Sequence, residues 1–375
     1  MKKSLLWLVV VLLSISMIAV FSLAGCKCKG EEVAPAEKVT EEEAAPAEEE
    51  AEEPVVEEKV VIGAAMVDVT NPFFVDVMKG GDQMAGAMNA EVIWKSSEGN
   101  LEKQIALIET FIEQDVDVIF IDPLDPVAVI PAIEKAYSAG IPTITAANLV
   151  ETPGNVSTPF PAKAAFKMLV DMVAAYLDYE GNILYSSGIP GNWILDQYLE
   201  GVEEGVAQYE NIVLLDEQPA KMDPALSQRI MEGWLTAYDE ISAVIFTTDP
   251  DMYSAIEAIK NADRINEFPL FSQNGDVKAV EMIQNNNENG VTIDLLSGAT
   301  RIGAFNIMLA IRLARGEKLP DVLWFGYLPV MNQDTWDYIV EKGFDQDVEW
   351  ITPEVALEIV ANADSEFLNW EPPAE

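Results

Sequence analysis

Along most of the chain, short apolar runs alternate with longer amphipathic stretches. Residues 60–67 form an apolar run of the length of a buried strand, and residues 74–88 follow with the spacing of a helix. Residues 101–114 show the helical pattern most clearly, because Leu101, Ile105, Ile108 and Ile112 recur every three or four positions. This repeated strand–helix pattern favours a mostly parallel sheet covered by helices on both faces.

The pattern divides into two blocks of similar size. In the first block the expected strands are 60–67, 91–95, 116–121 and 142–146, and the expected helices are 74–88, 101–114 and 127–139. In the second the expected strands are 182–187, 212–217, 243–247, 269–272 and 291–296, and the expected helices are 162–179, 194–209, 225–237, 251–262 and 277–285. A shorter block, with a helix over 303–315 and a strand over 322–327, is expected to complete one lobe, and further helical stretches follow from 329 to 370. Two such blocks predict two doubly wound lobes rather than one large sheet.

Four dipeptides place a capping residue directly before proline: Asn71-Pro72, Asp125-Pro126, Asp223-Pro224 and Asp249-Pro250. Asn and Asp are favoured at helix N-caps, and Pro is favoured at the first helical position. Three of the four pairs directly follow an expected strand. They therefore indicate helix starts at the carboxyl ends of strands, which is where doubly wound sheets bind ligands. Good capping alone also explains any single pair.

The first 25 residues have the layout of a secretory signal peptide, with Lys2 and Lys3 before a long apolar run. The run ends in Leu23-Ala24-Gly25-Cys26, which resembles the bacterial lipobox, in which the Cys becomes the lipidated N-terminus. The charge-free stretch 4–25 is also just long enough to span a bilayer uncleaved. The small residues before Cys26 favour lipoprotein processing. We therefore expect an extracytoplasmic protein, in the periplasm or at the cell surface, anchored to the membrane by a lipid on Cys26.

The next segment is strongly acidic. Residues 31–58 hold thirteen Glu and one Lys among Ala, Pro and Val, with no aromatic residue. Such a segment buries too little apolar surface to offset the entropy lost on ordering, and its like charges repel one another. Residues 26–58 are therefore expected to be the lipidated Cys and a disordered tether that holds a globular body away from the membrane.

Composition excludes several classes of function. Of the net charge of −42, the tether carries −12 and the four lysines before it carry +4, which leaves −34 on residues 59–375. A body this acidic argues against nucleic-acid binding, which needs clustered Lys and Arg. The chain has no His, which excludes Ser-His-Asp and Cys-His catalysis and His-ligated zinc. The only cysteines are Cys26 and Cys28, so the body has no disulfide, and we expect no cofactor and no metal.

Five short motifs follow one another between residues 61 and 142: Val61-Ile62-Gly63, Asn71-Pro72-Phe73-Phe74, Gln104-Ile105, Asp122-Pro123-Leu124-Asp125 and Ala139-Gly140-Ile141-Pro142. In this order and spacing they resemble the periplasmic ribose-binding-type sugar-binding proteins (type I, cluster B). The resemblance is strongest over residues 60–148 and continues more loosely to about residue 327. It implies the periplasmic binding protein type I fold, in which two α/β lobes with doubly wound parallel sheets are joined by a three-strand hinge.

The resemblance also implies lobe boundaries and a binding site. The first lobe would comprise residues 59–158 and about 298–327, and the second 159–297 and about 328–375, with hinge crossings near 157–161, 297–300 and 326–329. The implied ligand-binding residues are Asn71, Phe73, Phe74, Asp122 and Asn148 in the first lobe and Trp193, Asp196, Asp249, Gln273 and Asn274 in the second. These residue types suit a sugar, because aromatic rings cover its apolar face while Asp and Asn bind its hydroxyl rim.

The chain departs from the family pattern at several of these places. Ala147-Asn148 stands where the sugar binders commonly carry Asp-Arg, no basic residue lies near Asp196, and Met222 replaces an aromatic residue. Arg normally forks onto a pair of oxygens, so its absence argues against ribose. An acidic, Arg-poor site would suit an amino-substituted sugar, a polyol or another neutral or cationic solute.

Taken with the resemblance, the sequence predicts a binding protein and not an enzyme. It would capture a sugar or related polyhydroxylated solute and deliver it to the permease subunits of an ABC importer, as a membrane-anchored monomer. Two alternatives are a sensor that presents its ligand to a membrane receptor and a carboxylate-pair glycosidase, which needs no His. The glycosidase would usually be a barrel of eight βα repeats, and the sequence has no P-loop, GxSxG or GxGxxG motif.

Overall fold

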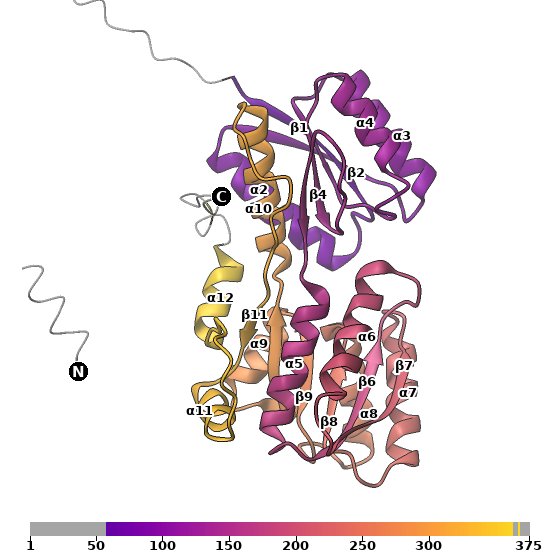
Figure 1. Cartoon of the computed structure of the whole chain (residues 1–375), viewed down its shortest axis with the longest axis vertical. Helices are drawn as coiled ribbons and strands as arrows, with labels where there is room; N and C mark the ends of the chain where they lie inside the picture. The colour runs from indigo at the N-terminus through magenta and orange to yellow at the C-terminus, as the bar shows by residue number, and fades with distance from the viewer. Residues whose placement is uncertain (1–57, 363–366, 368–375) are drawn as a thin grey trace, which may run out of the picture. The chain divides into compact units, whose positions relative to one another are not determined.

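The structure is a computed structural model that describes residues 58–362 and Phe367. The predicted signal peptide, Cys26, Cys28 and all but the last residue of the predicted tether lie outside these residues. Within them the chain forms two α/β lobes, each built on its own sheet (Figure 1). In this part of the chain, no helix has the length and apolar character needed to cross a bilayer.

The first lobe is a five-stranded sheet in the order β2-β1-β3-β4-β5, with every strand parallel to its neighbours. Its strands are β1 (Val60–Met66), β2 (Ala90–Ser96), β3 (Val118–Ile121), β4 (Thr143–Ala147) and β5 (Asn155–Pro159). The helices between them are α2 (Pro72–Ala87), α3 (Leu101–Glu113) and α4 (Ile130–Ser138). The central strands β1 and β3 are buried almost throughout because helices cover both faces, which explains their continuous apolar sequences.

The second lobe is a six-stranded sheet in the order β11-β10-β9-β8-β6-β7, in which only the edge strand β11 is antiparallel. Its strands are β6 (Gly181–Ser187), β7 (Ile212–Pro219), β8 (Ala243–Phe246), β9 (Leu270–Asn274), β10 (Val291–Leu296) and β11 (Leu328–Val330). One face is covered by α5 (Ala162–Tyr176), α6 (Trp193–Val206) and α11 (Gln333–Glu341). The other is covered by α7 (Pro224–Ala237), α8 (Asp249–Asn261), α9 (Val277–Gln284) and α12 (Pro353–Ala361). A short 3-10 helix, η1 (Glu288–Gly290), precedes β10.

The chain passes between the two sheets three times. It leaves β5 for α5, returns from β10 into α10 (Ala299–Ala314), and then runs beside β5 before it enters β11. Helix α10 follows a strand of the second sheet but packs along α2 of the first lobe (Figure 1).

Two glycines allow α10 and α2 to approach closely. A Cβ on Gly80 of α2 would lie 1.9 Å from the carbonyl oxygen of Thr300, and one on Gly303 of α10 would lie 1.8 Å from that of Val77. Both distances are far below van der Waals contact, so each position accepts only glycine at this helix separation. The resulting contact buries the middle of both helices.

Two fold predictions need correction. The strand expected over 322–327 does not form: Val322 makes a single bridge to Ser157, and the nearby strand is β11, which begins at Leu328. The helix expected from residue 303 begins four residues earlier, at Ala299. In both places the positions of the ends depend on contacts with the other lobe.

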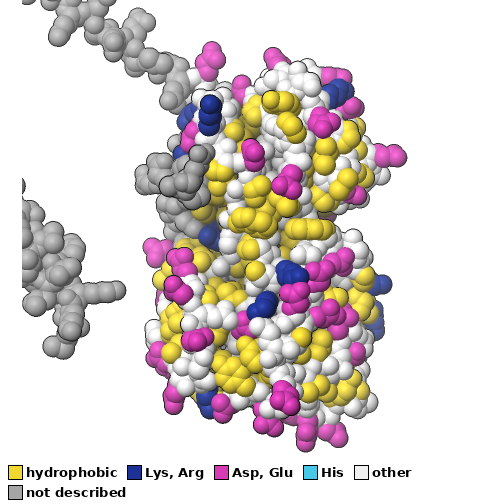
Figure 2. Space-filling model, in the orientation of Figure 1, with side chains coloured by type: hydrophobic (Ala, Val, Ile, Leu, Met, Phe, Trp, Pro, Cys, Tyr) yellow, Lys and Arg dark blue, Asp and Glu magenta, His cyan; other side chains and the backbone are white. Residues whose placement is uncertain are grey.

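The surface reflects the acidic composition. Figure 2 shows Asp and Glu side chains scattered over both lobes on the face in view, with fewer Lys and Arg among them. Most Lys and Arg side chains that form ion pairs do so with acidic residues at the surface, for example Lys163 with Glu200. Exposed pairs of this kind contribute little to stability, typically about 0–1 kcal/mol.

Candidate functional site

The first turn of α2 places two aromatic rings beside the carboxyl end of β1. Asn71 is the N-cap: its side-chain oxygen accepts a hydrogen bond of 2.9 Å from the backbone N–H of Phe73, and Pro72 opens the helix. Phe73 and Phe74 are half-buried, and their rings meet edge to face at 5.4 Å between centroids and 82° between planes. The predicted cap is thus confirmed, and the Asn71 side chain is engaged in holding the turn.

These rings line a small pocket at the carboxyl ends of β1, β3 and β4. The pocket encloses about 30 Å³, enough for a water molecule but far too little for a sugar ring. Its lining residues are Met66, Phe73, Phe74, Val77, Phe120, Asp122, Ala146, Ala147, Phe160 and Ile302. The structure therefore brings three of the predicted residues, Phe73, Phe74 and Asp122, around one cavity. Its single polar side chain is the carboxyl group of Asp122.

Asp122 follows the last residue of β3 and is held there by its backbone. The buried Gln104 of α3 donates from Nε2 to the carbonyl oxygen of Asp122 at 2.7 Å, and its Oε1 accepts from the N–H of Leu124 at 2.9 Å. The carboxyl group itself has neither a hydrogen bond nor an ion pair with another residue among 58–362. Burial alone raises its pKa from 3.8 to about 7. Near neutral pH, Asp122 therefore changes between a protonated acid and a carboxylate.

Asn148 lies next to this pocket, but its side chain is used structurally. Its Nδ2 donates to the carbonyl oxygen of Pro123 at 3.0 Å, which ties the end of β4 to the loop after β3. Ala147 before it has a left-handed backbone, with φ of +65°. A direct contact between Asn148 and a ligand stays a prediction. Among the residues that sequence reasoning did not assign to the site are Phe160, which lines the pocket, and Gln104, which positions its loop.

In the second lobe, two predicted residues lie at the start of α6. Asn192 is the N-cap, and Trp193, the first helical residue, is 37% exposed. The carboxyl group of Asp196 accepts a hydrogen bond of 3.0 Å from the N–H of Gly191, so it stabilises the turn before the helix. Trp193 remains the more accessible of the two for contact with a solute.

Asp249 lies deeper than its sequence position suggested. Thr248, not Asp249, is the N-cap of α8, which corrects the interpretation of the Asp249-Pro250 pair. The Asp249 side chain is fully buried, and its Oδ2 accepts from the N–H of Asp276 at 2.9 Å. Burial and the nearby acids Asp294 and Asp276 raise the pKa of Asp249 well above 3.8. In this conformation the Asp249 side chain therefore holds the loop between β9 and α9 in place through its hydrogen bond to the backbone of Asp276.

Gln273 and Asn274 end strand β9 at the same edge of the second sheet. The side-chain amide of Gln273 is buried and lies 2.9 Å from the Ser297 hydroxyl, in the segment that leads into α10. The carbonyl oxygen of Asn274 accepts from the N–H of Gly298 at 3.1 Å. Both residues therefore connect β9 to a crossing between the lobes. Their proposed contact with a ligand stays a prediction.

Beside these residues, one acid from each lobe lies close enough for the two to repel each other. Asp276, in the loop after β9, is partly desolvated, and burial together with the negative charge of Asp76 in α2 raises its pKa to about 6. Asp76 is one helical turn from Phe73. The edges of the two lobes that carry the predicted site residues therefore present acids toward one another.

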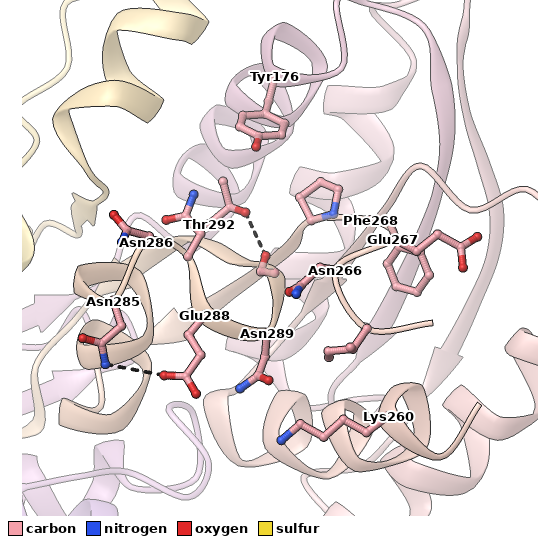
Figure 3. Close-up of a pocket in the computed structure, with 14 residues that line it drawn as sticks. Tyr176, Lys260, Asn266, Glu267, Phe268, Asn285, Asn286, Glu288, Asn289 and Thr292 are labelled. Atoms are coloured by element: carbon pink, nitrogen blue, oxygen red, sulfur yellow. Dashed lines mark hydrogen bonds between the residues drawn. The ribbon is translucent and has the colours of Figure 1, made fainter. Parts of the chain in front are cut away.

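A larger hollow of about 690 Å³ lies at the other end of the second-lobe strands, before β9 and β10 (Figure 3). Five of its fourteen lining residues are asparagines, and four of these, Asn266, Asn286, Asn287 and Asn289, have left-handed backbones. Asn tolerates this conformation better than most residues, so turn formation explains the composition. None of the predicted ligand residues lines this hollow, and it is at the amino ends of the strands, opposite the edge where α/β sheets bind ligands. Across the described ranges, no group of three or more Cys, Asp or Glu is arranged to hold a metal ion.

Comparison with known proteins agrees with this architecture. Residues 62–318 match the model of the periplasmic binding protein domain, and the chain belongs to that family. It is 27% identical over 293 residues to a xylitol-binding protein of Mycolicibacterium smegmatis, covering 75% of this chain and 79% of that protein. It is 25% identical over 263 residues to the ribose import binding protein of Escherichia coli, covering 70% of this chain and 87% of that protein.

Solved structures show the same fold. A solute-binding protein of an ABC transporter from Actinobacillus succinogenes, with bound D-allose, superposes with a TM-score of 0.68 at 21% identity, covering 75% of this chain and all of that one. A second solute-binding protein of an ABC transporter, from Bacillus halodurans with bound myo-inositol, superposes with a TM-score of 0.66 at 22% identity, covering 76% of this chain and 98% of that one. The chain is thus a periplasmic binding protein of type I architecture, a family implying an extracytoplasmic location.

Proposed function

We propose that this protein binds a sugar or polyol between its two lobes and delivers it to an ABC importer. The observation that carries the proposal is the meeting of Phe73, Phe74 and Asp122 around one pocket, at the edge of the first sheet where its strands end. Relatives over most of the chain are named for xylitol and ribose binding, which supports a polyhydroxylated ligand.

The residue types fit this ligand class. The C–H face of a sugar packs against aromatic rings, and each hydroxyl needs a donor or acceptor in place of water. The pocket is too small for the ring of a sugar, so most of the solute would lie outside it, between the first lobe and the residues that end the second-lobe strands. Lobe closure would follow because the solute binds the closed arrangement better than the open one.

We further propose that the chain is a monomeric lipoprotein that returns its solute chemically unchanged. The support is the signal-like N-terminus ending in Leu23-Ala24-Gly25-Cys26, together with a family whose members bind solutes. A radiolabelled fatty acid should be incorporated in bacterial cells that express the chain, and the Cys26→Ser variant should lose the label. Mass spectrometry of the released solute should show its original mass, and a changed mass would contradict the non-enzymatic assignment.

The direct test is a thermal-shift screen of the full chain in mild detergent, followed by intrinsic tryptophan fluorescence. Pentoses, hexoses, amino sugars and polyols are each added in excess. A ligand that binds only the folded state stabilises it by about 2.7 kcal/mol at a hundredfold excess over its dissociation constant. Phe73→Leu and Phe74→Leu keep the apolar volume but remove the aromatic face, so they should reduce the shift without changing the melting temperature of the free protein. A screen in which no sugar or polyol raises the melting temperature would contradict the proposal.

A further inference from the structure

The pocket beside Phe73 and Phe74 holds an isolated carboxyl group. Its nine other lining residues are all apolar, and four of them are phenylalanines: Phe73, Phe74, Phe120 and Phe160. Asp122 is therefore surrounded by groups that can neither donate a hydrogen bond from their side chains nor supply a positive charge. Asp122 is half-buried, so its carboxylate loses part of its hydration without gaining a partner, which is unfavourable. The free protein avoids that cost at neutral pH by keeping part of the Asp122 population protonated.

The charged groups on the surrounding elements do not supply the missing partner. None of the ion pairs within residues 58–362 includes Asp76, Asp122 or Asp276. Lys79 of α2, Lys103 of α3 and Arg312 of α10 do not line the pocket. Two further cations on nearby elements lie over other rings. Lys278, at the start of α9, is 4.1 Å from the centroid of Tyr253, and Arg301 of α10 is 5.0 Å from that of Phe325. Neither lines the pocket.

The acids of the second lobe extend the same negative environment. Asp276 faces Asp76, and Asp249 and Asp294 lie beneath the loop that carries Asp276. A solute held here meets carboxyl groups from both lobes. A negatively charged solute would be repelled, and a neutral one would leave these charges uncompensated.

We propose that the solute carries a protonated amino group, which enters the first-lobe pocket and pairs with the carboxylate of Asp122. This inference rests on the proposed binding function and narrows its ligand class to amino-substituted sugars or polyols. A cavity of about 30 Å³ matches an ammonium group, which is close to water in size, and excludes the carbohydrate ring. An ammonium placed over the face of one of the lining phenylalanine rings would be favoured further by its negative π-electron cloud, and the hydrogen bond to the carboxylate is charge-assisted.

The first experiment compares matched solutes by isothermal titration calorimetry on the full chain in mild detergent at pH 6.5 and low salt. The pairs are glucosamine with glucose and galactosamine with galactose, and glucuronate serves as the acidic counterpart. We expect at least one amino sugar to bind ten times more tightly than its neutral partner, and glucuronate to bind most weakly. This preference should shrink with added salt, because screening weakens attraction between charges.

The second experiment removes the charge. Asp122→Asn keeps the shape of the side chain, so the preference for the amino sugar should fall from tenfold to threefold or less. The matched control is Asp115→Asn, an exposed residue after α3, which should retain the preference. Because Asp122 has no side-chain partner to lose, its replacement should not lower the melting temperature, which separates loss of charge from loss of fold.

The third experiment uses pH. The amino sugar must displace the proton from Asp122, so its affinity should rise by roughly tenfold per pH unit between pH 5 and 6.5, while the amine stays protonated. A neutral solute that accepts a hydrogen bond from the protonated acid would show the opposite trend. Asp122→Asn should remove the pH dependence of the amino sugar.

The outcomes separate this inference from the function on which it rests. Neutral sugars or polyols that bind as tightly as their amino partners would overturn the amine assignment and leave the solute-binding function intact. A tenfold preference that survives in Asp122→Asn would also overturn it. If no amino or neutral member of the panel binds, the proposed function itself fails.

Discussion

A buried acid in the second lobe should make stability depend on pH. Asp294 of β10 is fully buried beside Asp249 and the backbone of Asn274 and Gly275. The groups around it are the acids Asp249 and Asp276, with Tyr253 and Lys278 beyond them. Burial raises the pKa of Asp294 from 3.8 to about 7. The perturbation we consider is Asp294→Asn, which mimics the protonated acid in shape and has no charge to desolvate.

The magnitude follows from linkage between protonation and folding. Because the folded state holds the proton more tightly than the unfolded state, the stabilising effect is fully present below about pH 4 and is lost as the pH rises through 7. Each pH unit in this window is worth about 1.4 kcal/mol. Raising the pH from 5 to 8 should therefore cost the wild type about 3 kcal/mol through this one carboxyl group. Asp294→Asn should therefore be stabilising by about 1.6 kcal/mol at pH 5 and by about 4 kcal/mol at pH 8.

The assay is urea unfolding followed by tryptophan fluorescence at pH 5, 6, 7 and 8, with the buried Trp234 reporting on the second lobe. Asp263→Asn, an exposed site after α8, is the matched control and should change the free energy of unfolding equally at every pH. Comparing each variant with wild type at the same pH cancels the contributions of acids that do not interact with the replaced residue. A difference for Asp294→Asn that stays constant from pH 5 to pH 8 would refute the reasoning, because the carboxyl group would then not be held protonated.

Three further predictions concern packing, capping and loop position. Gly303→Ala places a Cβ 1.8 Å from the carbonyl oxygen of Val77 and should lower the free energy of unfolding by about 3 kcal/mol or more. In the same urea series the control Gly86→Ala, which has open space around it, should leave the free energy of unfolding unchanged or raise it by up to about 1 kcal/mol. Asp223→Ala removes the side-chain cap of α7 and should cost about 1 kcal/mol in a thermal melt, which Asp223→Asn should largely restore. Gln104→Leu removes the two hydrogen bonds that hold the loop after β3, so the dissociation constant of any solute found in the screen should rise at least tenfold by calorimetry. An unchanged dissociation constant would show that the loop needs no such support.

Much of the fold could be predicted from the sequence because local signals and burial agree. The apolar runs of β1 and β3 predicted strands, and the apolar spacing of α3 predicted a helix. The structure has these elements at the predicted places. The cap at Asn71 was also predicted, since its side chain acts on residues two positions away. Two of the four capping pairs are exceptions. At Asp249-Pro250, Thr248 precedes the pair and is itself a good N-cap, so the helix begins one residue earlier. At Asp125-Pro126, Asp125 accepts from Val127 and Ala128 in a turn, and α4 begins only at Ile130.

The site was less predictable because it depends on which strands lie side by side. The motif containing Phe73 and Phe74 and the motif containing Asp122 were each visible, but their meeting around one pocket follows from the pairing of β1 with β3. Phe160 carries no local signal, since its role depends on a chain crossing. The burial of Asp249 and Asp294 was hidden for a similar reason, because polar residues within or after a strand give no indication of how deeply a neighbouring helix covers them.

The packing of α10 on α2 bears on how the protein is made. The first lobe's sheet is complete in sequence by residue 159, yet the helix that covers α2 is translated only after the strands β6 to β10 of the second sheet. A ribosome adding about 5–20 residues per second therefore leaves the glycine-containing face of α2 without its neighbour for about 10–45 seconds. During that interval the nascent chain exposes apolar surface that a chaperone or the export machinery would have to protect, and a gene fragment ending near residue 160 would leave it exposed permanently.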